Sequence, residues 1–339
     1  MKPLNLLFDG NYLIHKTFSV WSTYYQDSKK SAEENERAVY EALRDKEKQQ
    51  VFIRKIVIDL CYAVQRFPDV KRVAVVIDSH SWRYNFYDDY KYGLTRVRSE
   101  YYDEFCRMID KIEEFLRSKG LIVSRVHGAE GDDLLYIWSI YFSQVLDVRL
   151  VIVTGDSDIR QIMDDNVSLF NNNSKVLKFY CVKSNEVYWN EYFDTDVFVE
   201  AVVPFEVLLY KVIMGDTSDN IPKLKKGFGP AAFQKFIAAI TPYKQPEPLT
   251  VVDTAQWIAK RFSDFAKVTY EEVLGQVIFN LQMTWLNLAV YNDTNCMKRN
   301  GKNLLENMLD DVNKNKNKYK YNRSIHLNQF TDYRLNNVI

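Results

Sequence analysis

The sequence predicts an α/β fold built on a parallel sheet, because three short apolar segments alternate with stretches of helical pattern. The apolar segments cover residues 4–8, 73–77 and 150–153. Continuous apolar strands of this length are typical of parallel sheets, whose strands are buried on both faces. Each segment is closely followed by an aspartate, namely Asp9, Asp78 and Asp156. Ligands bind at the carboxyl ends of such strands, so we expect the three carboxylates to converge at one point.

Helical patterns fill the stretches between and after these segments. The predicted helical regions cover residues 31–65, 101–119 and 200–300. In the first of them Val51, Ile58 and Tyr62 recur at helical spacing. Residues 301–323 are rich in Asn and Lys, and a solvated tail and a phosphate-contacting arm are both open for them.

Composition limits the class of protein. The chain has 339 residues, enough for about two domains, and it lacks an apolar run long enough to span a membrane and a signal-peptide core. We therefore expect a soluble, untargeted protein. Lys and Arg number 45 and so do Asp and Glu, a balance that argues against a simple polyanion binder but permits an acidic metal site with a basic rim. Four scattered cysteines and four scattered histidines give no pattern of a disulfide framework or a zinc site.

Nine carboxylates carry the chemical interpretation: two follow the first two apolar segments singly, and seven lie in three short clusters. They are Asp9, Asp78, Glu130, Asp132, Asp133, Asp156, Asp158, Asp216 and Asp219. A single aspartate after a strand is usually a turn former or a helix cap, but a cap needs only one carboxylate. Carboxylates that converge without a counter-charge raise one another's pKa sharply. Divalent cations such as Mg²⁺ or Mn²⁺ resolve that conflict, and two ions about 3.5–4 Å apart form the usual clamp for phosphodiester cleavage.

Five motifs in this order resemble those of the 5′→3′ exonuclease and flap endonuclease superfamily, most of all its bacteriophage members related to phage ribonuclease H. The motifs are Leu7-Phe8-Asp9-Gly10-Asn11, Val76-Ile77-Asp78, Glu130-Gly131-Asp132-Asp133, Thr154-Gly155-Asp156-Ser157-Asp158 and Gly215-Asp216-Thr217-Ser218-Asp219-Asn220-Ile221-Pro222. The resemblance covers roughly residues 4–240. It implies a PIN-like parallel-sheet nuclease core joined to a helical helix-three-turn-helix domain.

The resemblance also implies a division of the chain. The nuclease domain would span residues 1–200 and include an arch or clamp at about 79–115. The duplex-binding helix-three-turn-helix domain would span residues 201–300. An Asn/Lys-rich C-terminal segment would occupy residues 301–339.

The resemblance gives the acids roles around two Mg²⁺ ions, for which Mn²⁺ is a substitute. The acids implied for the first ion are Asp9, Asp78, Glu130 and Asp132. Those implied for the second ion, some of them through water, are Asp158, Asp216 and Asp219. Asp156 would lie near both ions, and Asp133 would be either a ligand or a neighbour of the ligands. One ion would lower the pKa of a bound water, and the other would stabilise the leaving 3′ oxygen.

A basic and aromatic segment follows Asp78 and reproduces the spacing found in these nucleases. It contains Arg83, Tyr87, Tyr90 and Lys91. In the family the Arg and Lys face the scissile phosphate and the aromatic rings stack on bases, in keeping with electrostatic stabilisation and sequence-tolerant stacking. The alternative is an aromatic-rich helix packed on the core. Leu94 stands where the family often has an arginine, and Arg96 follows as a substitute contact with nucleic acid.

A glycine hairpin is the second segment expected to bind nucleic acid. It consists of Lys225, Lys226, Gly227, Phe228 and Gly229. Two glycines let backbone N–H groups approach a phosphate closely, and the start of the following helix favours an anion. An ordinary turn is the alternative, but the hairpin resembles the family's duplex-gripping motif.

Together these features predict a Mg²⁺-dependent, structure-specific 5′ nuclease. It would remove 5′ flaps of DNA or RNA primers during phage DNA replication and release 5′-phosphate products. Expected partners are flap, nicked or 5′-end duplex DNA and RNA–DNA hybrids, with a replication single-strand-binding protein or clamp as a candidate and no membrane. The expected location is the cytoplasm, that of the host if the chain is viral. Two alternatives are a PIN-type single-strand ribonuclease and a non-catalytic structure-specific DNA-binding protein.

Overall fold

A seven-stranded sheet forms the centre of the protein. The computed structural model describes residues 2–91, 101–172, 176–193, 196–241, 250–293 and 302–321. The strands are β1 (Leu4–Asp9), β2 (Val70–Val76), β3 (Ile122–Ser124), β4 (Arg149–Val153), β5 (Val167–Asn171), β6 (Leu177–Cys181) and β7 (Val197–Ala201). Their order across the sheet is β3-β2-β1-β4-β5-β6-β7.

Helices connect and cover the strands. The α-helices are α1 (Gly10–Thr23), α2 (Ala32–Arg44), α3 (Lys46–Gln65), α4 (Tyr102–Ser118), α5 (Gly131–Ile140), α6 (Glu186–Phe193), α7 (Pro204–Met214), α8 (Pro230–Ile240), α9 (Val251–Ala266), α10 (Tyr270–Thr284), α11 (Leu288–Asp293) and α12 (Leu304–Tyr321). Short 3₁₀ turns are η1 (Trp82–Asn85), η3 (Asp158–Ile162) and η4 (Lys183–Asn185), and η2 (Tyr141–Val145) is a π-helical turn. Among the helices that the structure describes, none has the length and apolar composition that crossing a bilayer needs.

The predicted parallel sheet is confirmed at its centre. β1 pairs in parallel with β2 on one side and with β4 on the other, so that Leu7 lies opposite Ala74 and Ile152. These three strands are the three that the apolar segments predict. The prediction missed β3, β5, β6 and β7, of which β3 has only three residues. β6 runs antiparallel to β5, so the complete sheet is mixed.

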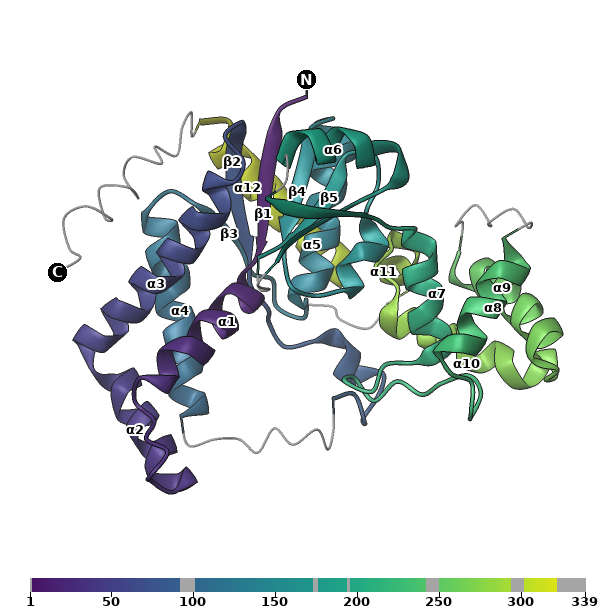
Figure 1. Ribbon diagram of the computed structural model, residues 1–339, viewed down its shortest axis with the longest axis horizontal. Coiled ribbons are helices and arrows are strands. Elements are labelled where there is room, and N and C mark those ends of the chain that lie inside the picture. The colour runs from purple at the N-terminus through teal and green to yellow at the C-terminus, as the bar shows by residue number, and fades with distance from the viewer. Residues whose placement is uncertain are drawn as a thin grey trace.

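Each face of the sheet carries its own layer of helices. Side chains alternate between the faces, so Leu6 and Phe8 pack on one side of β1 and Leu7 on the other. The face of Leu6 and Phe8 is covered by α1, α3, α4 and α6. The opposite face is covered by α5 and α12 (Figure 1).

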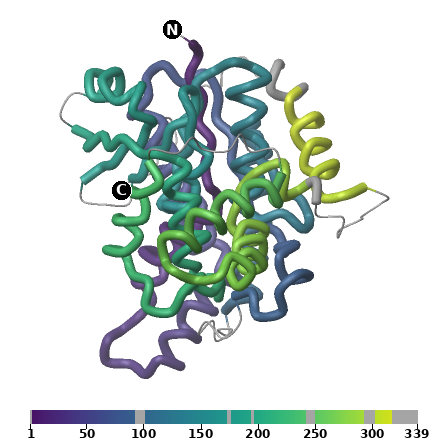
Figure 2. The backbone as a smooth tube through the Cα atoms, turned by 90° about the vertical axis from the view of Figure 1, so that its right-hand side faces the viewer, coloured from purple at the N-terminus to yellow at the C-terminus, as the bar shows by residue number. Residues whose placement is uncertain are grey.

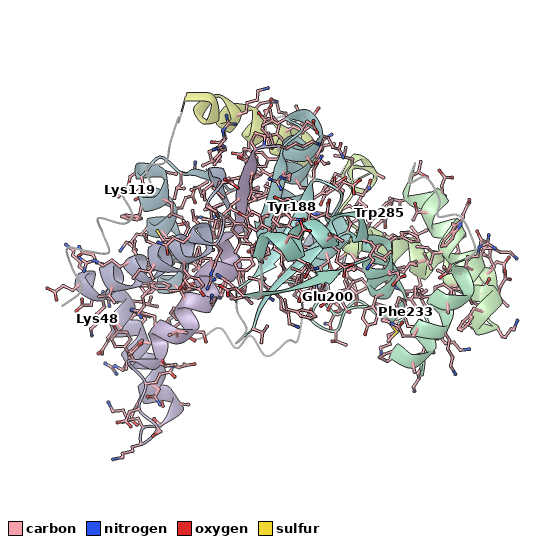
Figure 3. All side chains as sticks on the ribbon, turned by 45° about the horizontal axis from the view of Figure 1, so that its top comes forward. Lys48, Lys119, Tyr188, Glu200, Phe233 and Trp285 are labelled. Carbon is pink, nitrogen blue, oxygen red and sulfur yellow. The ribbon has the colours of Figure 1, made fainter. Side chains whose placement is uncertain are left out.

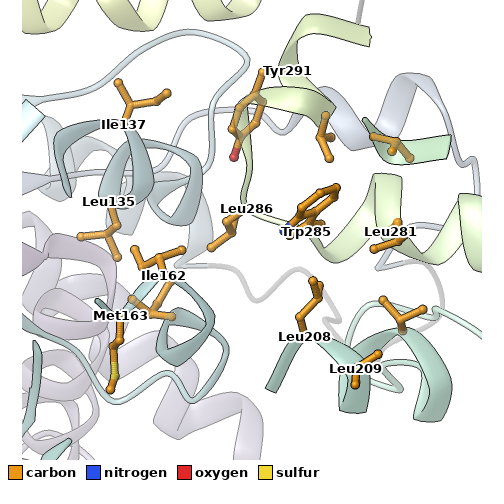
Figure 4. Close-up of a cluster of buried hydrophobic side chains, with 14 of the residues drawn as sticks. Leu135, Ile137, Ile162, Met163, Leu208, Leu209, Leu281, Trp285, Leu286 and Tyr291 are labelled. Atoms are coloured by element: carbon orange, nitrogen blue, oxygen red, sulfur yellow. The ribbon is translucent and has the colours of Figure 1, made fainter. Parts of the chain in front are cut away.

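A helical lobe formed by α7–α11 attaches to the sheet through one continuous apolar cluster. Leu135 of α5 and Ile162 of η3 belong to the same buried cluster as Leu208 of α7 and Trp285 after α10. Figure 4 shows these side chains between the sheet layer and the lobe, with the Tyr291 hydroxyl directed toward α5. Because the apolar core is shared, the lobe holds a fixed position beside the strand ends.

The C-terminal helix corrects one expectation. α12 packs against β3 and α5, and its side chains Leu304, Met308 and Val312 are buried. In Figure 2 this helix is the yellow segment at the margin of the fold. The described part of residues 301–323 is therefore neither a solvated tail nor a free arm, because an i, i+4, i+8 apolar stripe anchors it.

The long N-terminal helical region is confirmed but divided. Asp45 ends α2 and caps α3, accepting hydrogen bonds from the N–H groups of Glu47 and Lys48. The apolar stripe seen in the sequence is not the buried one: Val51, Ile58 and Tyr62 are 42%, 44% and 38% exposed. α3 instead buries the neighbouring face that includes Phe52, Ile56 and Leu60. Figure 3 places Lys48 on this side of the molecule, far from Phe233 of the helical lobe.

Candidate active site

Three strand ends bring three aspartates to one edge of the sheet. The Asp9 carboxylate, at the end of β1, accepts hydrogen bonds from the Tyr12 N–H at 2.9 Å and the Thr154 hydroxyl at 2.8 Å. Asp78 follows β2, and Asp156 follows β4 and accepts a hydrogen bond from the Asp158 N–H at 2.8 Å. Because β1 lies between β2 and β4, these side chains share one neighbourhood, as the sequence predicts.

The N-terminus of α5 delivers the next group of acids. The Gly131 N–H donates to Asp78 Oδ1 at 2.5 Å. A Cβ on Gly131 would lie 2.6 Å from that same oxygen, so a larger residue there would push the Asp78 carboxylate away. The contact fixes the start of α5, and with it Glu130 and Asp132, against the end of β2.

Four carboxylates in this group form no ion pair within the part of the chain that the structure describes. No ion pair joins Asp9, Asp78, Asp132 or Asp156 to a lysine or arginine among the described residues. Burial, helped by the charges of Asp9 and Glu130, raises the pKa of Asp78 to about 7. Burial and the charges of Asp156, Asp9, Glu130 and Asp78 raise the pKa of Asp132 well above its ordinary value. Burial also raises the pKa values of Asp9 and Asp156. Together these four carboxylates concentrate negative charge at this edge of the sheet.

Lysines compensate the remaining acids. Lys91 Nζ lies 2.5 Å from Glu130 Oε1 and 3.8 Å from Asp219 Oδ1. Although burial opposes ionisation, Arg83 and Lys91 lower the pKa of Glu130 to about 2. Burial raises the pKa of Asp219, against the opposing effect of Lys91.

Lys211 compensates a second pair of acids and was missed in the sequence. Its Nζ lies 2.7 Å from Asp158 Oδ2 and 2.6 Å from Asp216 Oδ2. A signal was available, since Lys211 is the single charged residue in the apolar run of residues 207–214. A charge on a buried helix face normally has a partner, so Lys211 could have been assigned to the acids that follow it.

Arg83 and Asp133 differ from their expected roles. Arg83 is 3% exposed, and its guanidinium is bidentate to Asp133, with a further contact to Glu130 at 2.7 Å and a bond from Nε to the Met283 carbonyl at 2.8 Å. Asp133 is fully buried and also accepts a hydrogen bond from the Tyr291 hydroxyl at 2.8 Å. Arg83 therefore does not face a scissile phosphate here, and Asp133 is committed to Arg83 rather than open to an ion.

The two tyrosines of this segment also differ from expectation. Tyr90 is 2% exposed, and its hydroxyl lies 2.9 Å from a Glu130 oxygen and 3.3 Å from an Asp219 oxygen, so its ring is not free to stack on a base. Tyr87 is half-buried, packs against the Phe279 ring and donates to the Asn220 carbonyl at 2.9 Å. Both rings thus pack against other side chains of the protein, although the segment is a 3₁₀ turn followed by further turns and not the helix of the alternative interpretation. Arg96 lies outside the described residues, as do residues 92–100 of the predicted arch.

The glycine hairpin separates into exposed and buried parts. A Cβ added at Gly227 or Gly229 would meet nothing within 4 Å, so the backbone there is open. Gly227 has φ +79°, whereas Gly229 has φ −117°, which any residue adopts. Lys226 is exposed, but the Lys225 ammonium donates to the Ala266 carbonyl at 2.6 Å. Phe228 is 7% exposed and packs on Phe262, so its ring belongs to the core and not to a nucleic-acid surface.

The chemistry of the donor set fits divalent cations. Asp9, Asp78, Asp132 and Asp156 supply only carboxylate oxygens, the ligands that Mg²⁺ and Mn²⁺ prefer. Their mutually raised pKa values mark a place where added positive charge is favourable. Among the described residues, however, no group of three or more His, Cys, Asp or Glu side chains is already arranged to hold one ion. The carboxylates would therefore have to turn toward an ion as it binds.

The chain belongs to the family described as 5′-3′ exonuclease, N-terminal resolvase-like domain, which matches residues 5–192. The 5′-3′ exonuclease of Mycoplasma pneumoniae is 31% identical over 153 residues, 44% of this chain and 47% of that protein. The 5′-3′ exonuclease of Buchnera aphidicola is 23% identical over 164 residues, 48% of this chain and 51% of that protein. The chain thus spans about half the length of these curated relatives.

Solved structures show the same fold. The T5 5′-exonuclease with bound divalent zinc ions aligns with a TM-score of 0.59 at 15% identity, over 91% of this chain and 98% of that one. A second T5 protein structure, co-crystallised with metal ions, aligns with a TM-score of 0.57 at 15% identity over 91% and 98% of the two chains. At this identity the likeness establishes the architecture of the nuclease fold.

Neutralising Asp78 should stabilise the metal-free protein. A carboxyl whose pKa rises from 3.8 to about 7 on folding binds more protons in the native state between those values, so stability falls as the pH rises through that window. Asp78→Asn lacks this penalty. We expect its Tm in EDTA at pH 8 to exceed that of the wild type by at least about 2 °C, with a smaller gain at pH 5.

Thermal melts at the two pH values measure this effect. Glu114→Gln, at an exposed position on α4, is the control and should shift little at either pH. A Tm for Asp78→Asn below that of the wild type at pH 8 would instead assign Asp78 a structural role.

Breaking the buried ion pair between Arg83 and Asp133 should lower the free energy of unfolding. Arg83→Met leaves Asp133 buried without its cation, which costs about 3–5 kcal/mol of unfolding free energy. Adding Asp133→Asn should recover part of that loss, whereas Arg117→Met, in an exposed pair with Glu113, should cost less than about 1 kcal/mol. Denaturant unfolding measures these values. If the double variant lost the sum of the unfolding free energies lost by the two single variants, the pairing of Arg83 with Asp133 would be contradicted.

Proposed function

We propose that the chain is a divalent-metal-dependent, structure-specific 5′→3′ exonuclease and flap endonuclease. It would hydrolyse phosphodiester bonds of 5′ flaps, 5′-end or nicked duplexes and RNA primers during phage DNA replication, in the cytoplasm of the host. Membership of the 5′-3′ exonuclease family and the likeness of the fold to the T5 5′-exonuclease support this proposal. The T5 structures with bound metal ions support divalent cations, for which we propose two Mg²⁺ or Mn²⁺.

The observation that carries the proposal is the excess of negative charge at the ends of β1, β2 and β4. Asp9, Asp78 and Asp132 would hold the first ion and Asp156 would lie near both ions, because these four form no ion pair within the described residues. Glu130, expected from the sequence as a further ligand of the first ion, is instead paired with Arg83 and Lys91. Asp158, Asp216 and Asp219 would serve the second. When bound, the ions would activate a water and offset charge on the leaving oxygen.

The protein's own groups would orient the substrate. Lys91, which now neutralises Glu130, is the half-buried cation that a scissile phosphate would meet at this edge. Its attraction for the phosphate grows as charge develops on the phosphoryl oxygens. Arg83 would act indirectly, since its hydrogen bonds hold the carboxylates of Glu130 and Asp133 in place. The Thr154 hydroxyl and the Tyr12 N–H keep the Asp9 carboxylate oriented.

Duplex DNA would bind at the glycine hairpin before α8. Open backbone at Gly227 and Gly229 beside the exposed Lys226 suits a phosphate contact that reads no bases. We propose residues 1–200 as the nuclease domain, with an arch at about 79–115, and residues 201–300 as the duplex-binding domain. This hairpin favours a flap nuclease over a PIN-type single-strand ribonuclease, and the full set of carboxylates favours an enzyme over a non-catalytic DNA-binding protein.

The first test is loss of one shared acid. Asp156→Asn should bind the divalent ions more weakly and still fold. Its rate of cleavage of a 5′-labelled flap, a nicked duplex and an RNA–DNA hybrid should therefore be lower by at least about 10³-fold. EDTA should abolish wild-type cleavage and Mg²⁺ should restore it. Glu114→Gln is the control. Near-normal turnover by Asp156→Asn would refute the assignment.

A second test separates duplex binding from chemistry. Gly229→Val clashes with nothing inside the protein, so it should weaken duplex binding while leaving the single-turnover rate at saturation unchanged. Lys91→Ala should slow that rate by about 10²-fold and change affinity less, as expected of one electrostatic contributor. Dissociation constants and single-turnover rates at one salt concentration decide this. If Gly229→Val slowed the rate at saturation while Lys91→Ala only weakened binding, the proposed placement of the two regions would be wrong.

A further inference from the structure

Lys211 lies where a cation would be held between two carboxylates. Its Nζ is 2.7 Å from Asp158 Oδ2 and 2.6 Å from Asp216 Oδ2, and the side chain is 17% exposed. These distances are those of strong charge-assisted hydrogen bonds. The ammonium therefore bridges η3, which follows β4, and the loop that follows α7.

The fold fixes this bridge from both sides. α7 ends at Gly215, whose φ of +68° turns the chain back, and a Cβ there would lie 2.3 Å from the Ile221 carbonyl oxygen. Asp216 then pairs with Ile221 through two backbone hydrogen bonds and accepts further ones from the Ser218 N–H and hydroxyl at 2.8 and 2.5 Å. The anionic partner is thus preformed.

We propose that the Lys211 ammonium is an internal surrogate for the second divalent ion, and that this ion binds between Asp158 and Asp216 only by displacing it. The proposal rests on the proposed function, since it assigns a means of regulating the same metal site. Lys211 is a positioning residue in this account: it acts through the two acids and touches no substrate.

Charge explains why the two cations compete. Two carboxylates and one ammonium leave a net charge of −1, whereas two carboxylates and one divalent ion leave zero. An ammonium and a divalent ion in the same gap would repel each other at a distance of a few Å in a half-buried setting, where screening is weak. The ammonium must therefore swing away on its flexible four-carbon stem as the ion enters. The metal-free site stays ordered, and the second ion binds more weakly than the first.

The contrast with the neighbouring acids makes the proposal specific. Asp9, Asp78, Asp132 and Asp156 have no such internal cation among the described residues, so an ion that binds there displaces nothing. Removing the Lys211 charge should change the weaker binding step most, because Lys211 forms ion pairs with Asp158 and Asp216 and acts on Asp156 only through its charge. The stronger step is then an internal reference in the same titration.

Calorimetric titration of the full chain with Mn²⁺ tests this. Wild type should show a strong step and a weak step, and Lys211→Met should tighten the weak step by at least about 10-fold with a smaller change in the strong step. Lys211→Arg keeps a cation and should retain the weak step as in the wild type. Lys260→Met, at an exposed pair on α9, is the matched control and should change neither step. A weak step that is unchanged or weaker in Lys211→Met would overturn the proposal.

Thermal melts supply an independent readout. In EDTA, Lys211→Met should have a lower Tm than the wild type, because two acids then face each other without a counter-charge. The rise in Tm on adding Mn²⁺ should be larger than in the wild type, following the linkage between binding and stability. An equal rise in Tm on adding Mn²⁺ to Lys211→Met and to the wild type would contradict displacement of the Lys211 ammonium by the ion. If Lys211→Met does not fold in EDTA, Lys211→Gln is titrated instead with the same expectations. Absence of any Mn²⁺ binding by the wild type would count against the proposed function itself.

Discussion

Repulsion between carboxylates at the ends of three parallel strands is the constraint on which the rest of the site depends. β1, β2 and β4 are adjacent, so Asp9, Asp78 and Asp156 share one edge, and α5 adds Asp132 to them. A buried core of apolar side chains on both faces of the sheet holds these strand ends in place. The free energy of that packing offsets the unfavourable concentration of charge, which the polar groups alone do not relieve.

The cationic side chains near these carboxylates contact some of the acids and not others. Lys91 and Lys211 each lie between two acids, and Arg83 pairs with Asp133 and Glu130. Arg83 also donates to the Met283 carbonyl at the end of α10, and Gln161 of η3 donates to the Thr284 carbonyl. The helical lobe and the acidic edge are therefore joined by hydrogen bonds as well as by apolar contacts.

Strands and acids could be predicted from the sequence because their signals are local. Continuous apolar runs mark β1, β2 and β4, and the acids follow them directly. The burial of Arg83 and Tyr90 could not be predicted, because it depends on contacts with Met283, Glu130 and Asp133 far away in the chain. The Lys211 bridge could be predicted only in part, because a single charge in an apolar run signals a partner but does not reveal that Asp158, on a distant element, is one of the two acids. In α3 the apolar stripe that looked buried is exposed.

Proton release on metal binding tests the central claim most directly. If the uncompensated carboxylates are the ion site, those with raised pKa values must lose protons when a divalent cation enters. Titration of the wild type with Mn²⁺ at pH 6 in two buffers of different ionisation enthalpy measures the number of protons released. The account predicts a clear release at pH 6 that falls toward zero at pH 9. Binding without proton release at pH 6, or no binding at either pH, would contradict it.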